Sequence, residues 1–141
     1  MTRQIVVFSL GGEEYALPID SVSEIIRHAE PRTVASDTPD VHGVIGLRGK
    51  IVPIVDLAGR LGLASTGTDP AGGKVIILDA DGGQLGIVVD EVDEVLTVPT
   101  EQLEAVPAAG SAVEAIAKLD DRLIMLLDAA AFVAAGQPAA A

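Results

Sequence analysis

The chain repeats its own pattern of apolar residues at an offset of 70 positions. Residues 5–26 align without a gap on residues 75–96, and a later block, residues 51–56, aligns at an offset of 72 on residues 123–128. Because the order of the blocks recurs as well as their composition, the sequence predicts two structurally similar halves. We expect a pseudo-two-fold axis that superposes residues 5–26 on residues 75–96.

Each half consists of short strands joined by glycine-rich turns, whose glycines supply the positive φ that tight hairpins need. The expected hairpins are residues 4–10 with 14–19 across Gly11-Gly12, and residues 75–80 with 84–89 across Asp81-Gly82-Gly83. A further strand pair brackets Gly49-Lys50 in the first half and Asp120-Asp121 in the second. Many short strands at close spacing predict a mostly β fold of two small antiparallel barrels or sheets packed together.

Short helices are expected where an aspartate precedes an apolar run. Asp20 is a candidate N-cap for a short amphipathic helix over residues 22–26, and Asp56 and Asp128 are candidate N-caps for helices over residues 56–63 and 128–135. Residues 90–96 fit either a helix or a continued strand. We expect residues 65–73 to form a linker or mobile loop, and residues 136–141 to be a disordered tail.

The chain is acidic, and its charge is unevenly distributed. The formal net charge is −12; residues 1–70 carry 6 basic and 9 acidic side chains, whereas residues 71–141 carry 3 basic and 12 acidic ones. Such a surface repels phosphate backbones and anionic lipid headgroups, so we expect no nucleic-acid partner and no direct membrane insertion. No apolar run reaches the roughly 18 residues that span a bilayer.

The motifs for cofactors are incomplete. The absence of cysteine excludes disulfides, thiolate metal sites and cysteine nucleophiles. Residues 46–50 resemble a phosphate loop, but Val44 stands where the first glycine is required and Ile51 where Ser or Thr is needed. His28 and His42 are too few and too separated for a credible metal site. We therefore expect no cofactor.

Three blocks of the sequence resemble one family. They are the blocks Glu14-Tyr15-Ala16-Leu17-Pro18-Ile19-Asp20-Ser21-Val22-Ser23-Glu24-Ile25-Ile26, Gly43-Val44-Ile45-Gly46-Leu47-Arg48-Gly49-Lys50-Ile51-Val52-Pro53-Ile54-Val55-Asp56-Leu57 and Gly86-Ile87-Val88-Val89-Asp90-Glu91-Val92. In this order and spacing they resemble the CheW-type domain, over roughly residues 3–135. The resemblance implies two SH3-like five-stranded antiparallel β-barrels, interleaved in one domain and accompanied by short helices.

The same resemblance implies a set of partner-binding residues. The family's central block usually reads Asn-Leu-Arg-Gly; Gly46 replaces the asparagine here, while Leu47, Arg48 and Gly49 match. Arg48 is the leading candidate because a guanidinium can bind a partner carboxylate bidentately; its structural alternative is a local ion pair with Asp56. The remaining candidates are Val22, Glu24 and Gly43. We expect Glu24 to be exposed, Ile25 to cover the core, and Gly43 to permit close backbone approach or only to form a turn.

By this resemblance the chain is expected to be a non-enzymatic adaptor that couples methyl-accepting chemoreceptors to the chemotaxis histidine kinase CheA. It would be cytoplasmic and recruited to receptor arrays at the inner face of the membrane. Two alternatives stay open: a small acid-dependent enzyme that uses Asp56 and Asp128, and an adaptor of a non-flagellar chemosensory system. An enzyme should place its acids in a deep polar pocket, whereas an adaptor should present shallow apolar grooves.

Overall fold

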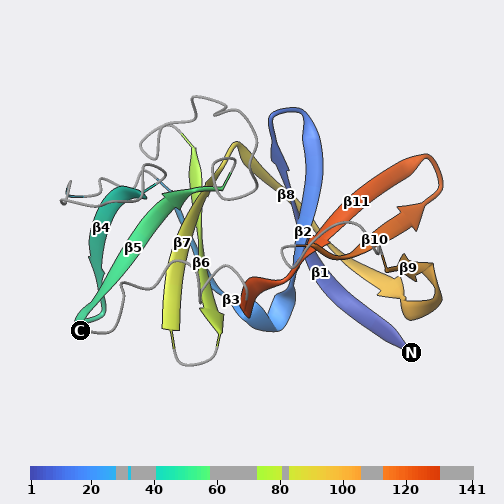
Figure 1. Ribbon diagram of the computed structural model, residues 1–141, viewed down its shortest axis with the longest axis horizontal. Coiled ribbons are helices and arrows are strands. Elements are labelled where there is room, and N and C mark those ends of the chain that lie inside the picture. Colours follow the sequence, from blue (N-terminus) through green and yellow to red (C-terminus); the bar gives the residue numbers. More distant parts are fainter. Residues whose placement is uncertain (28–31, 33–40, 58–72, 81–82, 106–112, 131–141) are drawn as a thin grey trace.

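The computed structural model describes residues 1–27, 32, 41–57, 73–80, 83–105 and 113–130 of the 141-residue chain. Strands dominate these residues, with two short 3₁₀ helices, η1 and η2 (Figure 1). The elements are β1 (Thr2–Leu10), β2 (Glu13–Pro18), η1 (Ile19–Ser21), β3 (Val22–Arg27), β4 (Val41–Leu47), β5 (Lys50–Asp56), β6 (Lys74–Ala80), β7 (Gly83–Val89), β8 (Glu91–Pro99), η2 (Thr100–Gln102), β9 (Leu103–Glu104), β10 (Val113–Leu119) and β11 (Arg122–Leu127).

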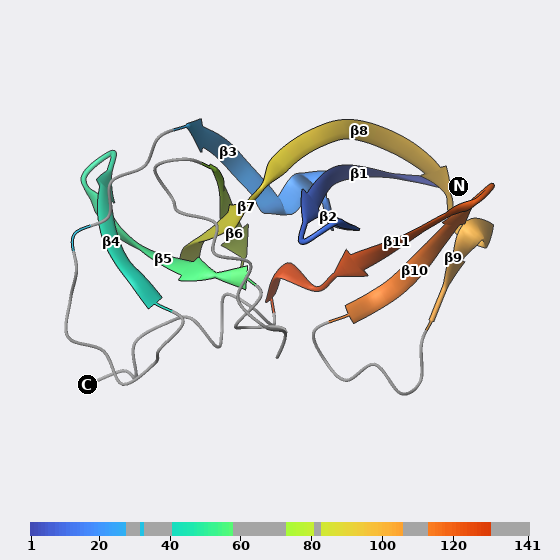
Figure 2. The same cartoon turned by 90° about the horizontal axis from the view of Figure 1, so that it is seen from above.

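The strands form two curved sheets that lie side by side along the long axis of the molecule (Figures 1 and 2). One sheet has the order β8-β1-β2-β11-β10-β9, and the other has the order β3-β6-β7-β5-β4. Every strand of the first sheet except β9 has a counterpart in the second sheet, and the counterparts follow one another in the same order. In that order, β8 corresponds to β3, β1 to β6, β2 to β7, β11 to β5, and β10 to β4. The mostly β fold of two similar halves, predicted from the sequence, is therefore confirmed.

The repeat extends to the register of individual pairs. Val22 pairs with Leu78 in one sheet, and Val92 pairs with Phe8 in the other, so that both partners are shifted by 70 positions. A register shift follows each pair, between Val22 and Glu24 and between Val7 and Phe8, which places the bulges at equivalent points. Bulges raise the local twist of a strand. The two sheets therefore curl in the same way.

The two halves exchange their third strands. β3 follows β1 and β2 in the chain but pairs with β6 in the other sheet, and β8 follows β6 and β7 but pairs with β1. Each sheet also holds one parallel pair, β2 with β11 and β5 with β7, so the sheets are not wholly antiparallel as expected. β9 adds a sixth strand of two residues to the first sheet. Parallel pairing is possible here because the partners of each pair are far apart in the sequence and are not joined by a hairpin.

Buried aliphatic side chains form three clusters. One lies within the sheet that contains β1 and includes Ile5, Val7 and Ile124. A second lies within the sheet that contains β6 and includes Val75 and Ile77, the repeat equivalents of Ile5 and Val7. The third contains residues from both sheets, among them Phe8, Leu10, Tyr15, Leu17, Val55, Leu57, Ile76, Leu78, Leu85 and Ile87. β1 and β6 contribute to two clusters each, which explains their uninterrupted apolar runs.

The predicted helix over residues 22–26 is wrong. These residues form β3, whose burial alternates with a period of two, and its backbone pairs with β6. Val and Ile favour a strand when a neighbouring edge is available for pairing, and here tertiary pairing overrides the weak helical pattern. Ile25 consequently points outward and is 43% exposed, contrary to its expected place over the core. Glu24 takes a half-buried position instead of an exposed one.

The other segments expected to be helical have mixed outcomes. Of residues 90–96, which fit either a helix or a strand by sequence, residues 91–96 belong to β8 and Asp90 is a bend before it. Asp128 is an N-cap as predicted, because its Oδ1 accepts a hydrogen bond of 3.1 Å from the backbone N–H of Ala130. Ala129 and Ala130 are helical, as is Leu57 after Asp56. Outside the described residues lie residues 58–63 and 131–135 of the expected helices, residues 65–72 of the linker expected over residues 65–73, and the tail over residues 136–141.

Candidate functional site

The hairpin of β4 and β5 presents Arg48 at its tip. Leu47 pairs with Lys50, which leaves Arg48 and Gly49 as a two-residue turn. Their φ values are +52° and +78°, the combination that a type I′ turn requires. Glycine tolerates this conformation, whereas arginine adopts it at some cost. The turn therefore holds a guanidinium out from the sheet, with 75% of the Arg48 side chain exposed.

Arg48 contacts Glu24, another predicted site residue, and not the Asp56 of the structural alternative. Arg48 Nη1 lies 3.0 Å from Glu24 Oε1. The contact is an ion pair without hydrogen-bond geometry: within the described residues, Oε1 is shielded from solvent and accepts no hydrogen bond. Glu24 lies on β3 and Arg48 at the end of β4, which are the two edge strands of one sheet. The ion pair thus links the two edges, while most of the guanidinium stays accessible.

The other sheet contains a corresponding ion pair that is much more tightly held. Glu94, which is 70 positions after Glu24, lies 3.0 Å from Arg122 on β11. Arg122 also donates two hydrogen bonds to Glu14 on β2, from Nε at 3.0 Å and from Nη2 at 2.6 Å. Bidentate charge-assisted pairs of this kind fix the plane of the guanidinium. Arg122 is thus committed to structure, whereas Arg48 has a single intramolecular contact among the described residues.

The pKa of Glu14 records the strength of this network. The hydrogen bonds from Arg122 lower the pKa of the Glu14 carboxyl below its ordinary value of 4.5, against a smaller opposing effect of burial. The same hydrogen bonds, with that from Arg122 to Glu94, raise the pKa of the guanidinium. In the sheet that carries Arg48, the position of Glu14 is taken by Gln84, 70 positions later. In that sheet, the position equivalent to Glu14 therefore carries no carboxylate that could hold an arginine as Glu14 holds Arg122.

The remaining predicted residues are less exposed than Arg48. Val22 is partly buried against the cluster between the sheets, and Leu47 is partly buried against the cluster beneath β4 and β5. Gly43 is buried within β4, with a φ of +151° at a register shift. A bulge accounts for glycine at that position. Glu24, Arg48 and Gly49 are brought together at one end of the sheet, while Val22, Gly43 and Leu47 lie partly or wholly within it.

Sequence reasoning missed the exposed surface beside this turn. Ile51 is 77% exposed, the largest exposure of a β-strand aliphatic side chain among the described residues. It pairs across the hairpin with Gly46, and a Cβ built at Gly46 meets nothing within 4 Å. The missing side chain thus leaves one flank of Ile51 uncovered. Arg32 joins the same sheet through two backbone hydrogen bonds with Val44, of 2.8 and 2.9 Å. The sequence feature that could have indicated this exposure is Gly46, which stands where the family usually has asparagine.

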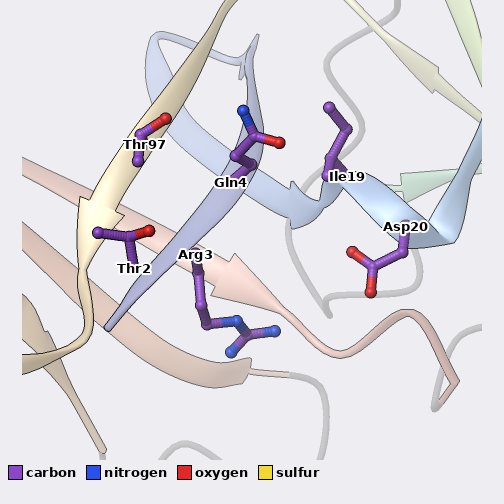
Figure 3. A pocket seen from close by; sticks show the side chains of 6 residues that line it. All are labelled: Thr2, Arg3, Gln4, Ile19, Asp20 and Thr97. Atoms are coloured by element: carbon purple, nitrogen blue, oxygen red, sulfur yellow. The ribbon is translucent and has the colours of Figure 1, made fainter.

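A polar hollow of about 450 Å³ lies apart from the predicted residues (Figure 3). Its walls come from β1, η1 and β8, and it is lined by Thr2, Arg3, Gln4, Ile19, Asp20 and Thr97. Neither Asp56 nor Asp128 lines it, and Asp128 is engaged as a helix cap. The hollow therefore does not provide the acidic pocket that the enzyme alternative requires.

The described residues contain no group of three or more His, Cys, Asp or Glu side chains placed to hold a metal ion. His28 lies outside them, so the expectation for the two histidines is untested there. Within the same part of the chain, no helix is long and apolar enough to cross a membrane.

The chain is similar to known proteins over nearly its whole length. The profile of the CheW-like domain matches residues 4–137. A chemotaxis protein CheW of Bacillus subtilis is 33% identical over 90% of this chain and 84% of its own length. A chemotaxis protein CheW of Klebsiella aerogenes is 37% identical over 89% of this chain and 78% of its own length. The crystal structure of the scaffolding protein TtCheW from Thermoanaerobacter tengcongensis superposes with a TM-score of 0.83 at 34% identity, covering 91% of this chain and 90% of that one.

Proposed function

Because this chain belongs to the CheW-like family of chemotaxis scaffolding proteins, we propose that it couples methyl-accepting chemoreceptors to the chemotaxis histidine kinase CheA. The family is non-enzymatic, so the alternative of an acid-dependent enzyme is set aside. Coupling without chemistry requires that the protein bind two partners at once and bind their signalling states with different affinities. Recruitment to receptor arrays at the inner face of the membrane follows from such binding.

The observation that carries this proposal is that Arg48 is mostly exposed and is held by one ion pair among the described residues. The Arg48 side chain is 75% exposed and makes a single ion pair among the described residues, with Glu24, whereas Arg122 in the other sheet is paired with both Glu14 and Glu94. An exposed guanidinium on an otherwise acidic protein attracts a partner carboxylate and can bind it bidentately. Arg48 is therefore assigned as the central contact, with Glu24 holding it in place.

The neighbouring predicted residues supply the rest of the proposed contact surface. Gly49 keeps the turn narrow, and Leu47 anchors the hairpin on the cluster beneath it. Val22 and Gly43 are assigned a supporting role through the shape of β3 and β4, because both are largely covered.

Direct titration tests the coupling function. The wild-type chain is titrated with the regulatory domain of the kinase, with a cytoplasmic helical-hairpin fragment of a receptor, and with both together. We expect binding to each partner alone and a ternary complex when all three are mixed. Failure to bind either partner would contradict the proposal, and mutually exclusive binding would show that the chain cannot act as a coupler.

A further inference from the structure

Both strands that flank the N-terminal hairpin, which we define as β1 with β2, come from the far end of the chain. The hairpin lies between β8 and β11 in the sheet order β8-β1-β2-β11, and both of these neighbours follow Asp90. All five strands of the other sheet lie between Val22 and Val89. One sheet is thus built from a continuous stretch of chain, whereas the other is assembled from two separate stretches, with the N-terminal hairpin as one of them (Figure 1).

The contacts that hold the N-terminal hairpin in its sheet are non-covalent and remote in sequence. β1 pairs with β8 along its length, and β2 pairs with β11. The Ser9 hydroxyl donates a hydrogen bond to Asp93, and the backbone N–H of Gly11 donates one of 2.9 Å to Asp90 Oδ2. Each of these partners follows residue 89, so the same contacts form equally well when the hairpin belongs to a different copy of the chain.

The connector between the N-terminal hairpin and β3 is the short 3₁₀ helix η1. None of its three residues is buried, and Ile19 lies at the surface beside the hollow (Figure 3). The hydroxyl of Ser21 donates a hydrogen bond of 2.7 Å to the carbonyl of Pro18, and the N–H of Val22 donates to the carbonyl of Ile19. Three residues rise about 6 Å as a 3₁₀ helix and about 10 Å when extended. Opening η1 therefore lengthens the connector while disturbing few contacts.

From this topology we propose that two copies of the chain exchange their N-terminal hairpins, so that β1 and β2 of each copy complete the sheet of the other. The exchanged dimer keeps every contact of the hairpin within its sheet and changes only the connector η1, which makes exchange a low-cost route to a closed dimer. The opposing term is the entropy of association, so the dimer forms at high protein concentration. The inference does not rest on the proposed coupling function, and its test uses this chain alone.

Because the chain contains no cysteine, an engineered disulfide can trap the exchange. Gln4 on β1 pairs directly with Thr97 on β8, and both residues are exposed. The Cα atoms of such cross-strand pairs are about 4.5–5.5 Å apart, which suits a disulfide. Gln4→Cys and Thr97→Cys are unfolded together in urea, refolded at about 1 mM, the effective concentration of a segment on a short linker, and oxidised. We expect a covalent dimer that contains one chain of each kind.

The matched control is a second cysteine pair that the exchange does not separate. Lys118 on β10 pairs directly with Leu123 on β11, and both are exposed, but both belong to the same stretch of chain after residue 90. A mixture of Lys118→Cys and Leu123→Cys should therefore give no mixed covalent dimer. Gln4→Cys alone should give none either, because its cysteine faces the native Thr97 in any exchanged dimer. A chain that carries both Gln4→Cys and Thr97→Cys should close its disulfide within a monomer.

Sedimentation of the refolded wild type provides an independent measurement. An exchanged dimer should persist after dilution, because the hairpin must leave its sheet before the chains separate, whereas a dimer held by surface contact dissociates. A variant that lacks residues 19–21 joins β2 directly to β3, which prevents closure within one chain, and it should be dimeric at every concentration. The inference is overturned if the refolded wild type is wholly monomeric, if Gln4→Cys and Thr97→Cys yield no mixed dimer, or if the control pair yields as much as they do.

Discussion

Glu24 and Glu94 occupy equivalent positions in the two sheets, and each lies 3.0 Å from an arginine nitrogen. The arginines come from the corresponding hairpins but from different places in them: Arg48 is the first residue of its turn, whereas Arg122 begins the strand after its turn. Arg122 reaches a second carboxylate, that of Glu14, whereas Arg48 contacts no second carboxylate within the part of the chain that the structure describes. At this duplicated position, Glu94 is thus part of an arginine network that holds its sheet together, whereas Glu24 pairs with an arginine that stays accessible.

Arg122 is predicted to stabilise the fold in a pH-dependent way. Because Arg122 lowers the pKa of Glu14 below 4.5, its contribution is present above that pH and is lost as the pH falls through the lowered pKa. Arg122→Met should therefore reduce the free energy of unfolding by about 1 kcal/mol at neutral pH, and by less in acid. Urea denaturation of the variant and the wild type between pH 2 and pH 7, a range that includes the ordinary pKa values of carboxyl groups, measures the difference in unfolding free energy and its dependence on pH.

The control for this prediction is Lys118→Met. Lys118 and Glu104 are both more than half exposed, so their loss should change stability by no more than about 0.5 kcal/mol at any pH. A constant difference between Arg122→Met and wild type across the pH range would contradict the role given to Glu14.

We predict that a side chain at Gly86 is tolerated only if the side chain of Ile54 is shortened. A Cβ at Gly86 would lie 2.4 Å from Ile54 Cδ1, within the buried cluster under β5 and β7. Gly86→Ala should destabilise the protein by about 1–3 kcal/mol, the usual cost of overpacking a core. Ile54→Val removes the Cδ1 atom, so the double variant should lose less than the sum of the two single variants. Additive losses in denaturant titrations would count against the steric explanation.

The turn at Arg48 and Gly49 gives a third prediction. Gly49 has a φ of +78°, which a β-branched residue adopts only with strain. Gly49→Val should therefore cost about 1–2 kcal/mol of stability in thermal or denaturant unfolding. Arg48→Asn is the matched change, since asparagine accepts the same region of φ, and it should be at least as stable as wild type. Equal stability of Gly49→Val and wild type would exclude the type I′ turn.

Much of the fold was predictable because the two halves share a pattern. The offset of 70 positions located β1, β2, β6 and β7, whose apolar runs are long and whose turns are marked by glycine. It did not identify β3 as a strand, because its helical and extended patterns are both short, and the edge of β6 that decides between them is distant in the sequence. The exchange of β3 and β8 between sheets, a consequence of long-range pairing, could not be read locally.

The candidate site was predictable in part. Arg48 and Gly49 were identified by their family resemblance, and both are exposed; their part in partner binding stays a prediction. The partner of Arg48 was not identified, because Glu24 and Asp56 are both acidic and only the closure of the sheet decides which lies near the turn. The exposure of Ile51 depends on the absence of a side chain at Gly46, a pairing that becomes visible only once the register of β4 and β5 is known.

The central claim is that Arg48 binds a signalling partner and does not hold the fold together. The direct measurement is calorimetric titration of Arg48→Glu with the regulatory domain of the kinase and with a receptor fragment. Its matched control is Lys118→Glu, which changes the charge equally at an exposed site in the other sheet. Arg48→Asn serves as a second variant that keeps the turn but removes the guanidinium.

We predict that Arg48→Glu melts like the wild type, with a stability change within about ±0.5 kcal/mol, because the side chain is mostly exposed. Losing a bidentate donor and adding repulsion should weaken binding by about 30-fold to 1,000-fold, with a smaller loss for Arg48→Asn and none for Lys118→Glu. If Arg48→Glu remains folded and binds both partners as tightly as the wild type, Arg48 is not the contact.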